Sequence, residues 1–251
     1  MKWLKPDYSL GKMFMEFPDI IILAGGFGTR LRESIQNLPK AMAPVNGRPF
    51  LEYQLDFISH FGFKRVILST GYLSTAIEHH FGSRYRKLDL VYASESEPLG
   101  TGGAVKLSFD KVITPHALIL NGDTLFRINL DRFFQKHIEN LAKVSIALRY
   151  VADASRYGII DCSQNGSVIA FREKSDQPMP GLINGGVYLI KAGYFRSLSL
   201  PDKFSLEKDM FAKMLDPELY KAQIFNDYFL DIGIPDDYLR AQTEFNEFKD
   251  R

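Results

Sequence analysis

The stretch Ile20–Leu31, IIILAGGFGTRL, decides the fold of this chain of 251 residues. Its first five residues are apolar and three of them are β-branched, which is typical of a strand buried inside a parallel sheet. Gly25, Gly26 and Gly28 follow at once and lack Cβ atoms, so the backbone can turn sharply and bring N–H groups against phosphate oxygens. The stretch therefore predicts an α/β protein with a phosphate-binding loop, although three glycines could also form only a tight turn.

Two common phosphate-binding motifs do not fit this loop. The dinucleotide fingerprint needs a third glycine where this chain has Leu31, and the Walker loop needs a Gly-Lys-Ser/Thr sequence that is absent. Arg30 and Lys40, which follows Pro39, instead offer two cations for a triphosphate. A nicotinamide-dependent oxidoreductase is therefore disfavoured, although Lys40 alone could be an ordinary surface charge.

Short apolar runs alternate with amphipathic stretches over the first 140 residues. This alternation predicts βαβ units and a largely parallel sheet. The predicted pairs of strand and helix are residues 20–24 with 50–61, 66–70 with 75–81, 88–93 with 102–107, and 117–121 with 130–140.

The second half of the chain has strands separated by Gly, Asn and Pro turns instead of long helices. It predicts strands at residues 144–151, 157–161, 168–172, 185–190 and 222–225, and helices at 206–215 and 235–248. We therefore expect a Rossmann-like three-layer sandwich of the α/β class, with a mixed, mainly parallel central sheet and antiparallel additions in the second half. Residues 16–251 are expected to form one domain after an N-terminal extension of residues 1–15.

The charges of the chain nearly cancel, with 31 Lys and Arg against 30 Asp and Glu. Without a net cationic field we expect no binding to nucleic acid or to a membrane surface. No apolar run approaches the roughly 18 residues that span a bilayer. One cysteine, Cys162, excludes an internal disulfide, and the first residues lack the apolar core of a secretory signal, so we expect a cytoplasmic protein.

Two aspartates can lie at strand ends, where open α/β sheets bind their ligands. Asp123 follows an apolar run, and Asp231 follows Phe229 and Leu230 and precedes a glycine. Carboxylate oxygens are hard ligands that suit Mg²⁺. Asp123 could equally be a turn or helix-capping residue.

Together these features resemble the sugar-1-phosphate nucleotidyltransferases, and the likeness covers nearly everything after the extension. Within that family it is strongest to enzymes that use GTP and a manno-configured heptose 1-phosphate. One departure is Ala41, where many relatives have a proline, and we expect it to loosen the turn that aims Lys40. The motifs that carry the resemblance are the glycine loop with Pro39-Lys40, Lys40–Pro44, Pro49–Glu52, Glu97–Ala104, Asn121–Asp123, Tyr157-Gly158, Glu173-Lys174, Leu182–Gly186, Phe204–Glu207, Asp227–Gly233 and Asp231–Pro235.

The resemblance implies a Mg²⁺-dependent transfer of GMP from GTP to a sugar 1-phosphate, with release of pyrophosphate. It implies Arg30, Lys40 and Asp123 as catalytic residues and Asp123 and Asp231 as metal ligands. The implied nucleotide-binding residues are Leu23, Ala24, Gly25, Gly26, Gly28, Thr29, Arg30, Lys40, Glu95, Pro98, Gly100 and Thr101. The implied sugar-phosphate-binding residues are Gly158, Glu173, Lys174, Asn184 and Gly185, although Lys174 alone reads as a solvent-facing charge.

Glu95 is the residue that predicts the base. Guanine presents two N–H donors that a carboxylate can accept together, whereas the N3–H of uracil lies between two carbonyl oxygens that a carboxylate would repel. Glu95 therefore favours GTP, and the alternative is an exposed glutamate in a polar run.

Other functions stay open at this stage. Mannose 1-phosphate with GTP, or another hexose 1-phosphate with UTP or dTTP, would use the same chemistry. A non-catalytic subunit that binds nucleotide sugars is a different possibility, and a homo-oligomer is possible. The histidines lack companions at zinc-ligand spacing, and Cys162 has no partner of a nucleophilic arrangement.

Overall fold

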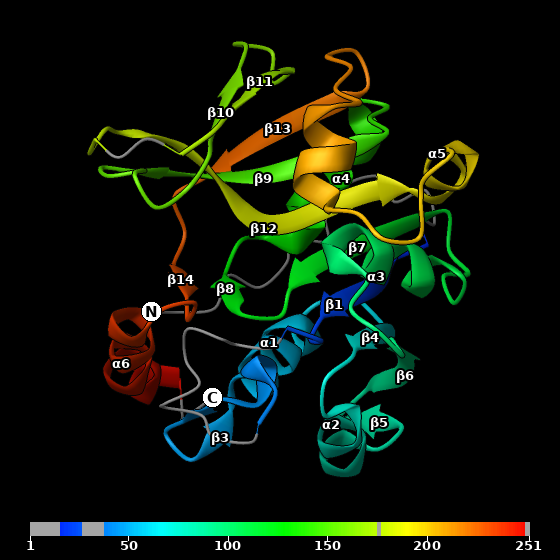
Figure 1. Ribbon diagram of the computed structural model, residues 1–251, viewed down its shortest axis with the longest axis vertical. Helices are drawn as coiled ribbons and strands as arrows, with labels where there is room; N and C mark the ends of the chain where they lie inside the picture. The colour runs from blue at the N-terminus through cyan, green and yellow to red at the C-terminus, as the bar shows by residue number, and fades with distance from the viewer. Residues whose placement is uncertain (1–15, 27–37, 175–176, 249–251) are drawn as a thin grey trace.

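The central strand β1 (Asp19–Leu23) lies inside the sheet, with β4 (Arg65–Thr70) and β7 (His116–Asn121) hydrogen-bonded on either side. Both pairs are parallel, and β6 (Leu88–Ser94) adds a further parallel strand beyond β4. The structure is a computed structural model that describes residues 16–26, 38–174 and 177–248 (Figure 1). The predicted parallel sheet in the first half of the chain is confirmed.

The strands of the second half extend this sheet beyond β7, mainly in the antiparallel direction. β12 (Gly181–Lys191) is antiparallel to β7, and β9 (Val144–Val151) is antiparallel to β12. The predicted antiparallel additions are therefore confirmed. One added pairing is parallel, between β9 and β13 (Tyr220–Phe225). The remaining strands of the sheet are β5 (Arg84–Tyr85), β10 (Ile159–Cys162) and β11 (Val168–Arg172).

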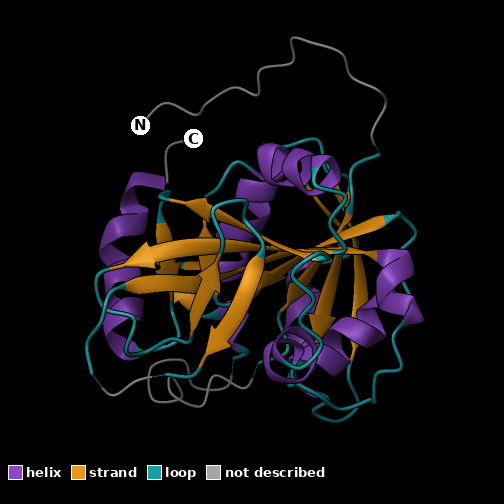
Figure 2. Cartoon of the chain, turned by 90° about the horizontal axis from the view of Figure 1, so that it is seen from above, coloured by secondary structure: helices purple, strands orange, loops and turns teal. Residues whose placement is uncertain are grey.

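Helices pack on both faces of the sheet, which gives the three layers that the sequence predicts (Figure 2). One apolar cluster includes side chains from α1 (Phe50–Ser59), α2 (Ser74–Phe81), α4 (Leu130–Glu139) and α6 (Pro235–Glu244). The other includes side chains from α3 (Gly100–Phe109), α5 (Ala192–Ser197) and the π-helix η3 (Leu206–Ala212). In the part of the chain that the structure describes, no helix is long and apolar enough to cross a bilayer.

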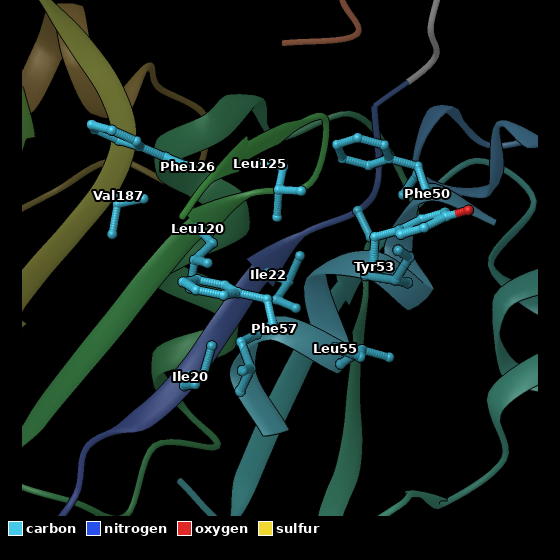
Figure 3. Close-up of a cluster of buried hydrophobic side chains, with 14 of the residues drawn as sticks. Ile20, Ile22, Phe50, Tyr53, Leu55, Phe57, Leu120, Leu125, Phe126 and Val187 are labelled. Atoms are coloured by element: carbon cyan, nitrogen blue, oxygen red, sulfur yellow. The ribbon is translucent and has the colours of Figure 1, made fainter. Parts of the chain in front are cut away.

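The alternation of side chains along β1 explains why one apolar strand holds both layers together. Ile20 and Ile22 belong to the first cluster and Ile21 to the second, and all three are fully buried. Figure 3 shows Ile20 and Ile22 next to Phe57 of α1. The run of isoleucines therefore fixes the layer order around the glycine loop that follows it.

Several elements differ from the prediction. The strands β8 (Thr124–Phe126) and β14 (Phe229–Asp231) form a separate antiparallel ribbon. This ribbon was not predicted, because strands of three residues are too short to show a periodic pattern in the sequence. The helix predicted at 206–215 is the shorter π-helix η3, and Tyr157 lies just before β10. The short elements not yet named are the 3-10 helices η2 (Lys40–Met42) and η4 (Phe245–Phe248) and the hairpin of β2 (Pro44–Val45) and β3 (Arg48–Pro49).

Candidate active site

A cavity of about 480 Å³ opens where β1, β4, β6 and β7 end. This is the edge at which parallel sheets of this kind bind their ligands. Of the predicted nucleotide-binding and catalytic residues, those that line the cavity are Leu23, Ala24, Gly25, Gly26, Lys40, Glu95, Pro98, Gly100, Thr101 and Asp123. The predicted residues Gly28, Thr29 and Arg30 lie outside the described part of the chain.

The floor of the cavity is made of strand ends that approach one another too closely for side chains. A Cβ atom on Gly25 would lie 3.1 Å from the backbone nitrogen of Gly71, which follows β4. A Cβ atom on Gly122, which follows β7, would collide with the carbonyl oxygen of Leu23. Glycine at these two positions therefore keeps the backbone of three strands exposed to a ligand.

Lys40 is held at the cavity by a short buried turn. It opens the 3-10 helix η2, in which Ala41 and Met42 are buried, and the N–H of Ala43 donates to its carbonyl oxygen at 3.0 Å. This burial and hydrogen bond hold the turn in place, and the effect of Ala41 relative to a proline stays a prediction. The ammonium group of Lys40 forms an ion pair with Asp123. Lys40 is thus not a free surface charge.

The ribbon of β8 and β14 brings the two predicted metal ligands together. Asp231 lies opposite Thr124 in the ribbon, and the N–H of Ile232 donates to the carbonyl oxygen of Asp123 at 2.9 Å. One carboxylate oxygen of Asp231 accepts the N–H of Gly233 at 2.7 Å. The two carboxylates therefore stand at neighbouring positions, although their residues are far apart in the sequence.

The proximity of the two carboxylates changes the pKa of Asp231. Burial and the charge of Asp123 raise the pKa of Asp231 from 3.8 to about 6, although the Lys40 ammonium and the Gly233 hydrogen bond oppose the rise. Two carboxylates and one lysine leave one negative charge in excess. Such a pair of hard oxygen donors fits a divalent cation such as Mg²⁺.

Glu95 lies against the cavity wall after β6. Its Oε2 atom accepts the N–H of Leu99 at 2.7 Å, and its Oε1 atom lies 3.1 Å from the position of a Cβ atom on Gly25. Burial raises the pKa of Glu95, and the bond from Leu99 opposes that rise. Glu95 is partly buried and hydrogen-bonded, so the alternative of an exposed glutamate is wrong.

The first turn of α3 opens into the same cavity through Gly100 and Thr101. Gly100 has φ +74°, and a Cβ atom on Gly102 would collide with the ring of Phe204. These glycines let the segment before η3 pack against α3, and the N–H of Gly102 donates to the Phe204 carbonyl at 2.9 Å. The N-terminus of a helix carries a partial positive charge, so this wall favours an anion.

The predicted sugar-phosphate residues lie in or next to the strands of the second half, outside the lining of this cavity. Asn184 lies in β12, and Glu173 and Lys174 are exposed beyond the end of β11. Gly158 and Gly185 have a packing reason to be glycine. A Cβ atom on Gly185 would collide with the ring of Phe126, and one on Gly158 would lie 3.0 Å from the carbonyl oxygen of Arg172.

Some cavity residues were not predicted as site residues. They include Ser69 near the end of β4, Gly71 and Tyr72 just after β4, Ser96 next to Glu95, and Asn121 at the end of β7. Their common signal is position, because each lies at or beyond the carboxyl end of a parallel strand. Asp123 stands out at such a position because it is charged, whereas these neutral side chains carry no comparable signal in the sequence.

A model of the nucleotidyl transferase family matches residues 19–247 of the chain. The D-glycero-alpha-D-manno-heptose 1-phosphate guanylyltransferase of Aneurinibacillus thermoaerophilus is 43% identical over 230 residues, which cover 92% of this chain and 99% of that protein. The protein of the same name from Campylobacter jejuni is 41% identical over 223 residues, which cover 87% of this chain and 96% of that protein. The crystal structure of HddC from Yersinia pseudotuberculosis has a TM-score of 0.82 and 32% identity, and the match covers 91% of this chain and all of that one; HddC has also been solved with GMP-PN.

Proposed function

We propose that this chain, which belongs to the nucleotidyl transferase family, transfers GMP from GTP to D-glycero-α-D-manno-heptose 1-phosphate. The observation that carries the proposal is the cavity lined by Gly25, Gly26, Lys40, Glu95 and Asp123, with the carboxylate of Asp231 close to that of Asp123. Two relatives that align over nearly their whole length carry the name of this activity. The products are a GDP-sugar and pyrophosphate.

The base of GTP is read by Glu95 in this proposal. One carboxylate oxygen of Glu95 already accepts the N–H of Leu99, and each carboxylate oxygen has a second lone pair. The fixed carboxylate can therefore accept N1–H and the exocyclic amino group of guanine without moving. Uracil and thymine offer only one N–H between two oxygens, which the same carboxylate repels.

The triphosphate lies between the glycine loop and the first turn of α3. Gly25 and Gly26 expose backbone N–H groups along one side, and Gly100 and Thr101 stand at the positive end of the helix. Lys40 supplies a mobile positive charge that is already at the cavity. We extend the proposal to Arg30, which the sequence places in the same loop as a second cation.

Asp123 and Asp231 would hold the Mg²⁺ ion, and the ion would neutralise charge on the phosphates of GTP. Burial and the charge of Asp123 raise the pKa of Asp231, and a bound cation would relieve the repulsion between the two carboxylates. Lys40 partly fills that role through its ion pair with Asp123. When GTP enters, Lys40 can exchange this carboxylate for a phosphate oxygen at little cost, because both partners are anions.

The reaction needs positioning more than a protein nucleophile. A phosphate oxygen of the sugar 1-phosphate attacks the α-phosphorus of GTP; the new P–O bond forms while the bond to the bridging oxygen breaks, and pyrophosphate leaves. Lys40 stabilises the charge that builds on the departing group. The helix end and the backbone N–H groups are oriented before GTP arrives, so little reorganisation of these groups is needed during the step.

The sugar 1-phosphate is held from the second half of the sheet. Asn184 and Glu173 offer hydrogen bonds to sugar hydroxyl groups, and Lys174 offers a cation to the sugar phosphate. Lys174 is exposed, so it can reach a phosphate without leaving a buried partner. Gly158 and Gly185 keep the backbone beside these residues free of side chains.

The test is pyrophosphate release across a grid of nucleoside triphosphates and sugar 1-phosphates. We expect release to be fastest with GTP and the heptose 1-phosphate. Mannose 1-phosphate as the preferred sugar would refute the heptose assignment, and UTP or dTTP as the preferred nucleotide would refute the role of Glu95. No release with any pair would refute catalysis and leave a binding subunit.

Asp123→Ala tests the metal assignment in the same assay. We expect this variant to lose pyrophosphate release by at least about a hundredfold, because its carboxylate is both a proposed ligand and the partner of Lys40. Asp110→Ala, at the exposed end of α3, is the matched control and should leave the rate unchanged. Full activity of Asp123→Ala at limiting Mg²⁺ would show that another group holds the cation.

A further inference from the structure

The hydroxyl group of Tyr188 is a buried polar group that the proposed mechanism does not use. Tyr188 lies in β12, and its side chain is fully buried against the π-helix η3, with its ring centroid 5.1 Å from that of Phe211. Burial and the charge of Glu207 raise the pKa of Tyr188 well above its usual value, so the phenol stays protonated. A buried hydroxyl group needs hydrogen-bond partners, and those of Tyr188 point to both substrates.

The first partner is Asn184, which we place at the sugar. Its Nδ2 atom donates to the Tyr188 hydroxyl at 2.8 Å, and its Oδ1 atom accepts the N–H of Gly186 at 2.9 Å. The register of β12 shifts between Asn184 and Tyr188, and Gly186 has φ +71° within that bulge. The bulge therefore fixes the carboxamide at both ends, and each end keeps one position for a ligand hydroxyl group.

The second partner is Glu207, in the first turn of η3. The Tyr188 hydroxyl donates to the Oε1 atom of Glu207 at 3.3 Å. The Oε2 atom of Glu207 accepts the hydroxyl groups of Thr101 at 2.9 Å and Ser205 at 3.2 Å. Thr101 lies in the first turn of α3 and lines the nucleotide cavity. Glu207 therefore connects the buried phenol to the wall of that cavity.

We propose that Tyr188 is a positioning residue that links Asn184 at the sugar site to Thr101 at the nucleotide site through Glu207. The inference rests on the proposed function, because that function places a sugar at Asn184. The amide donates to the phenol, and the phenol and the threonine hydroxyl both donate to the carboxylate. Without the phenol oxygen, the amide of Asn184 can rotate and Glu207 loses one of its donors.

The consequence is a selective loss at the sugar site. Asn184 depends on the phenol for its orientation, whereas Thr101 keeps its bond to Glu207 and accepts the N–H of Leu206 at 2.9 Å. Binding of the sugar 1-phosphate should therefore weaken more than binding of GTP. A purely structural role of the phenol would lower stability and affect both substrates alike.

The experiment compares Tyr188→Phe with Tyr220→Phe in steady-state kinetics of pyrophosphate release. Tyr220 is the matched control because it is also fully buried in the same core, and its hydroxyl group meets only that of Tyr194, at 3.4 Å, among the bonds described. We expect Tyr188→Phe to raise KM for the sugar 1-phosphate about tenfold, the effect of losing one well-placed hydrogen bond. KM for GTP should change less than about threefold, and Tyr220→Phe should match the wild type.

A second variant tests the link to the nucleotide side and protects the experiment against misfolding. Glu207→Gln keeps an acceptor for the phenol but removes the charge, at a partly buried position. We expect a smaller rise in KM for the sugar than in Tyr188→Phe. The double variant should be no worse than Tyr188→Phe alone, because both changes interrupt one chain of hydrogen bonds. If the increases in KM caused by the two single substitutions multiply in the double variant, the proposed link through Tyr188 and Glu207 is overturned.

Unchanged KM values in Tyr188→Phe, or equal rises for both substrates, would overturn the positioning role. Thermal unfolding of each variant, measured beside the kinetics, identifies an effect that comes from lost stability. A wild type that releases no pyrophosphate from GTP and the heptose 1-phosphate refutes the proposed function instead. The same comparison is then made with the sugar 1-phosphate that the wild type accepts, so that the two failures are distinguished.

Discussion

Asp231→Asn should make the metal-free protein more stable while it abolishes activity. Burial and the charge of Asp123 raise the pKa of Asp231 from 3.8 to about 6. The folded state therefore binds the proton more tightly than the unfolded chain does. The ionised carboxylate destabilises the fold above pH 6, and the destabilisation disappears as the pH falls below about 4.

The magnitude follows from the rise in pKa. The pKa of Asp231 rises by about 2, and each pKa unit corresponds to roughly 1.4 kcal/mol. The ionised carboxylate therefore lowers the free energy of unfolding by on the order of 3 kcal/mol at pH 7. Asparagine has nearly the same shape, carries no charge, and can still accept the N–H of Gly233 that now donates to Asp231 at 2.7 Å. The variant should regain up to this free energy of unfolding at pH 7 and little of it at pH 4.

The assay is urea unfolding of wild type and variant in EDTA, at several pH values between 4 and 7. Asp227→Asn, four residues earlier and exposed, is the control and should show no such difference. Added Mg²⁺ should stabilise the wild type more than Asp231→Asn, since binding to the folded state stabilises by mass action. A variant that is less stable than the wild type at pH 7, or a difference independent of pH, would refute the electrostatic argument.

Three further changes test the nucleotide side. Glu95→Gln should lower kcat/KM for GTP roughly tenfold relative to UTP, because hydrogen bonds to a charged acceptor are about twice as strong as neutral ones, whereas Glu78→Gln outside the cavity should not. Lys40→Met should slow pyrophosphate release by about a hundredfold or more without loss of folding, and wild-type rates would exclude its role at the leaving group. Gly122→Ala should weaken GTP binding and stability, because its Cβ atom collides with a backbone carbonyl oxygen, whereas Gly193→Ala has open space and should be neutral or mildly stabilising; equal thermal unfolding of the two would contradict this.

The features that the sequence predicted well are those that depend on short stretches of chain. The run of isoleucines before Gly25 predicts a strand that is buried on both faces. Alternate side chains of this strand pack into the two clusters on opposite faces of the sheet. The family and the fold class inferred from such motifs are confirmed. Local chemistry of this kind is readable because the same few residues make the turn and present the backbone to the ligand.

The features that the sequence could not predict depend on residues far apart in the chain. The pairing of Asp231 with Thr124 exists only because two three-residue strands meet, and neither is long enough to show a period. Gly102 is glycine because the ring of Phe204 lies over it, which no local pattern reveals. Position at a strand end identified Asp123 and Asp231 separately. Only the fold shows that the two carboxylates lie close together, with Lys40 as the neighbouring cation.

The bulge in β12 explains why the sequence predicts the preferred base more easily than the preferred sugar. Glu95 follows directly from the end of a parallel strand, so its direction into the cavity follows from the topology of the sheet. The direction of Asn184 depends instead on a register shift, on Gly186, and on a phenol four residues further along the strand. If Asn184 binds the sugar as proposed, the choice of sugar depends on how β12 packs against η3. Substitutions at Tyr188 or in η3 should change sugar preference without changing the choice of base.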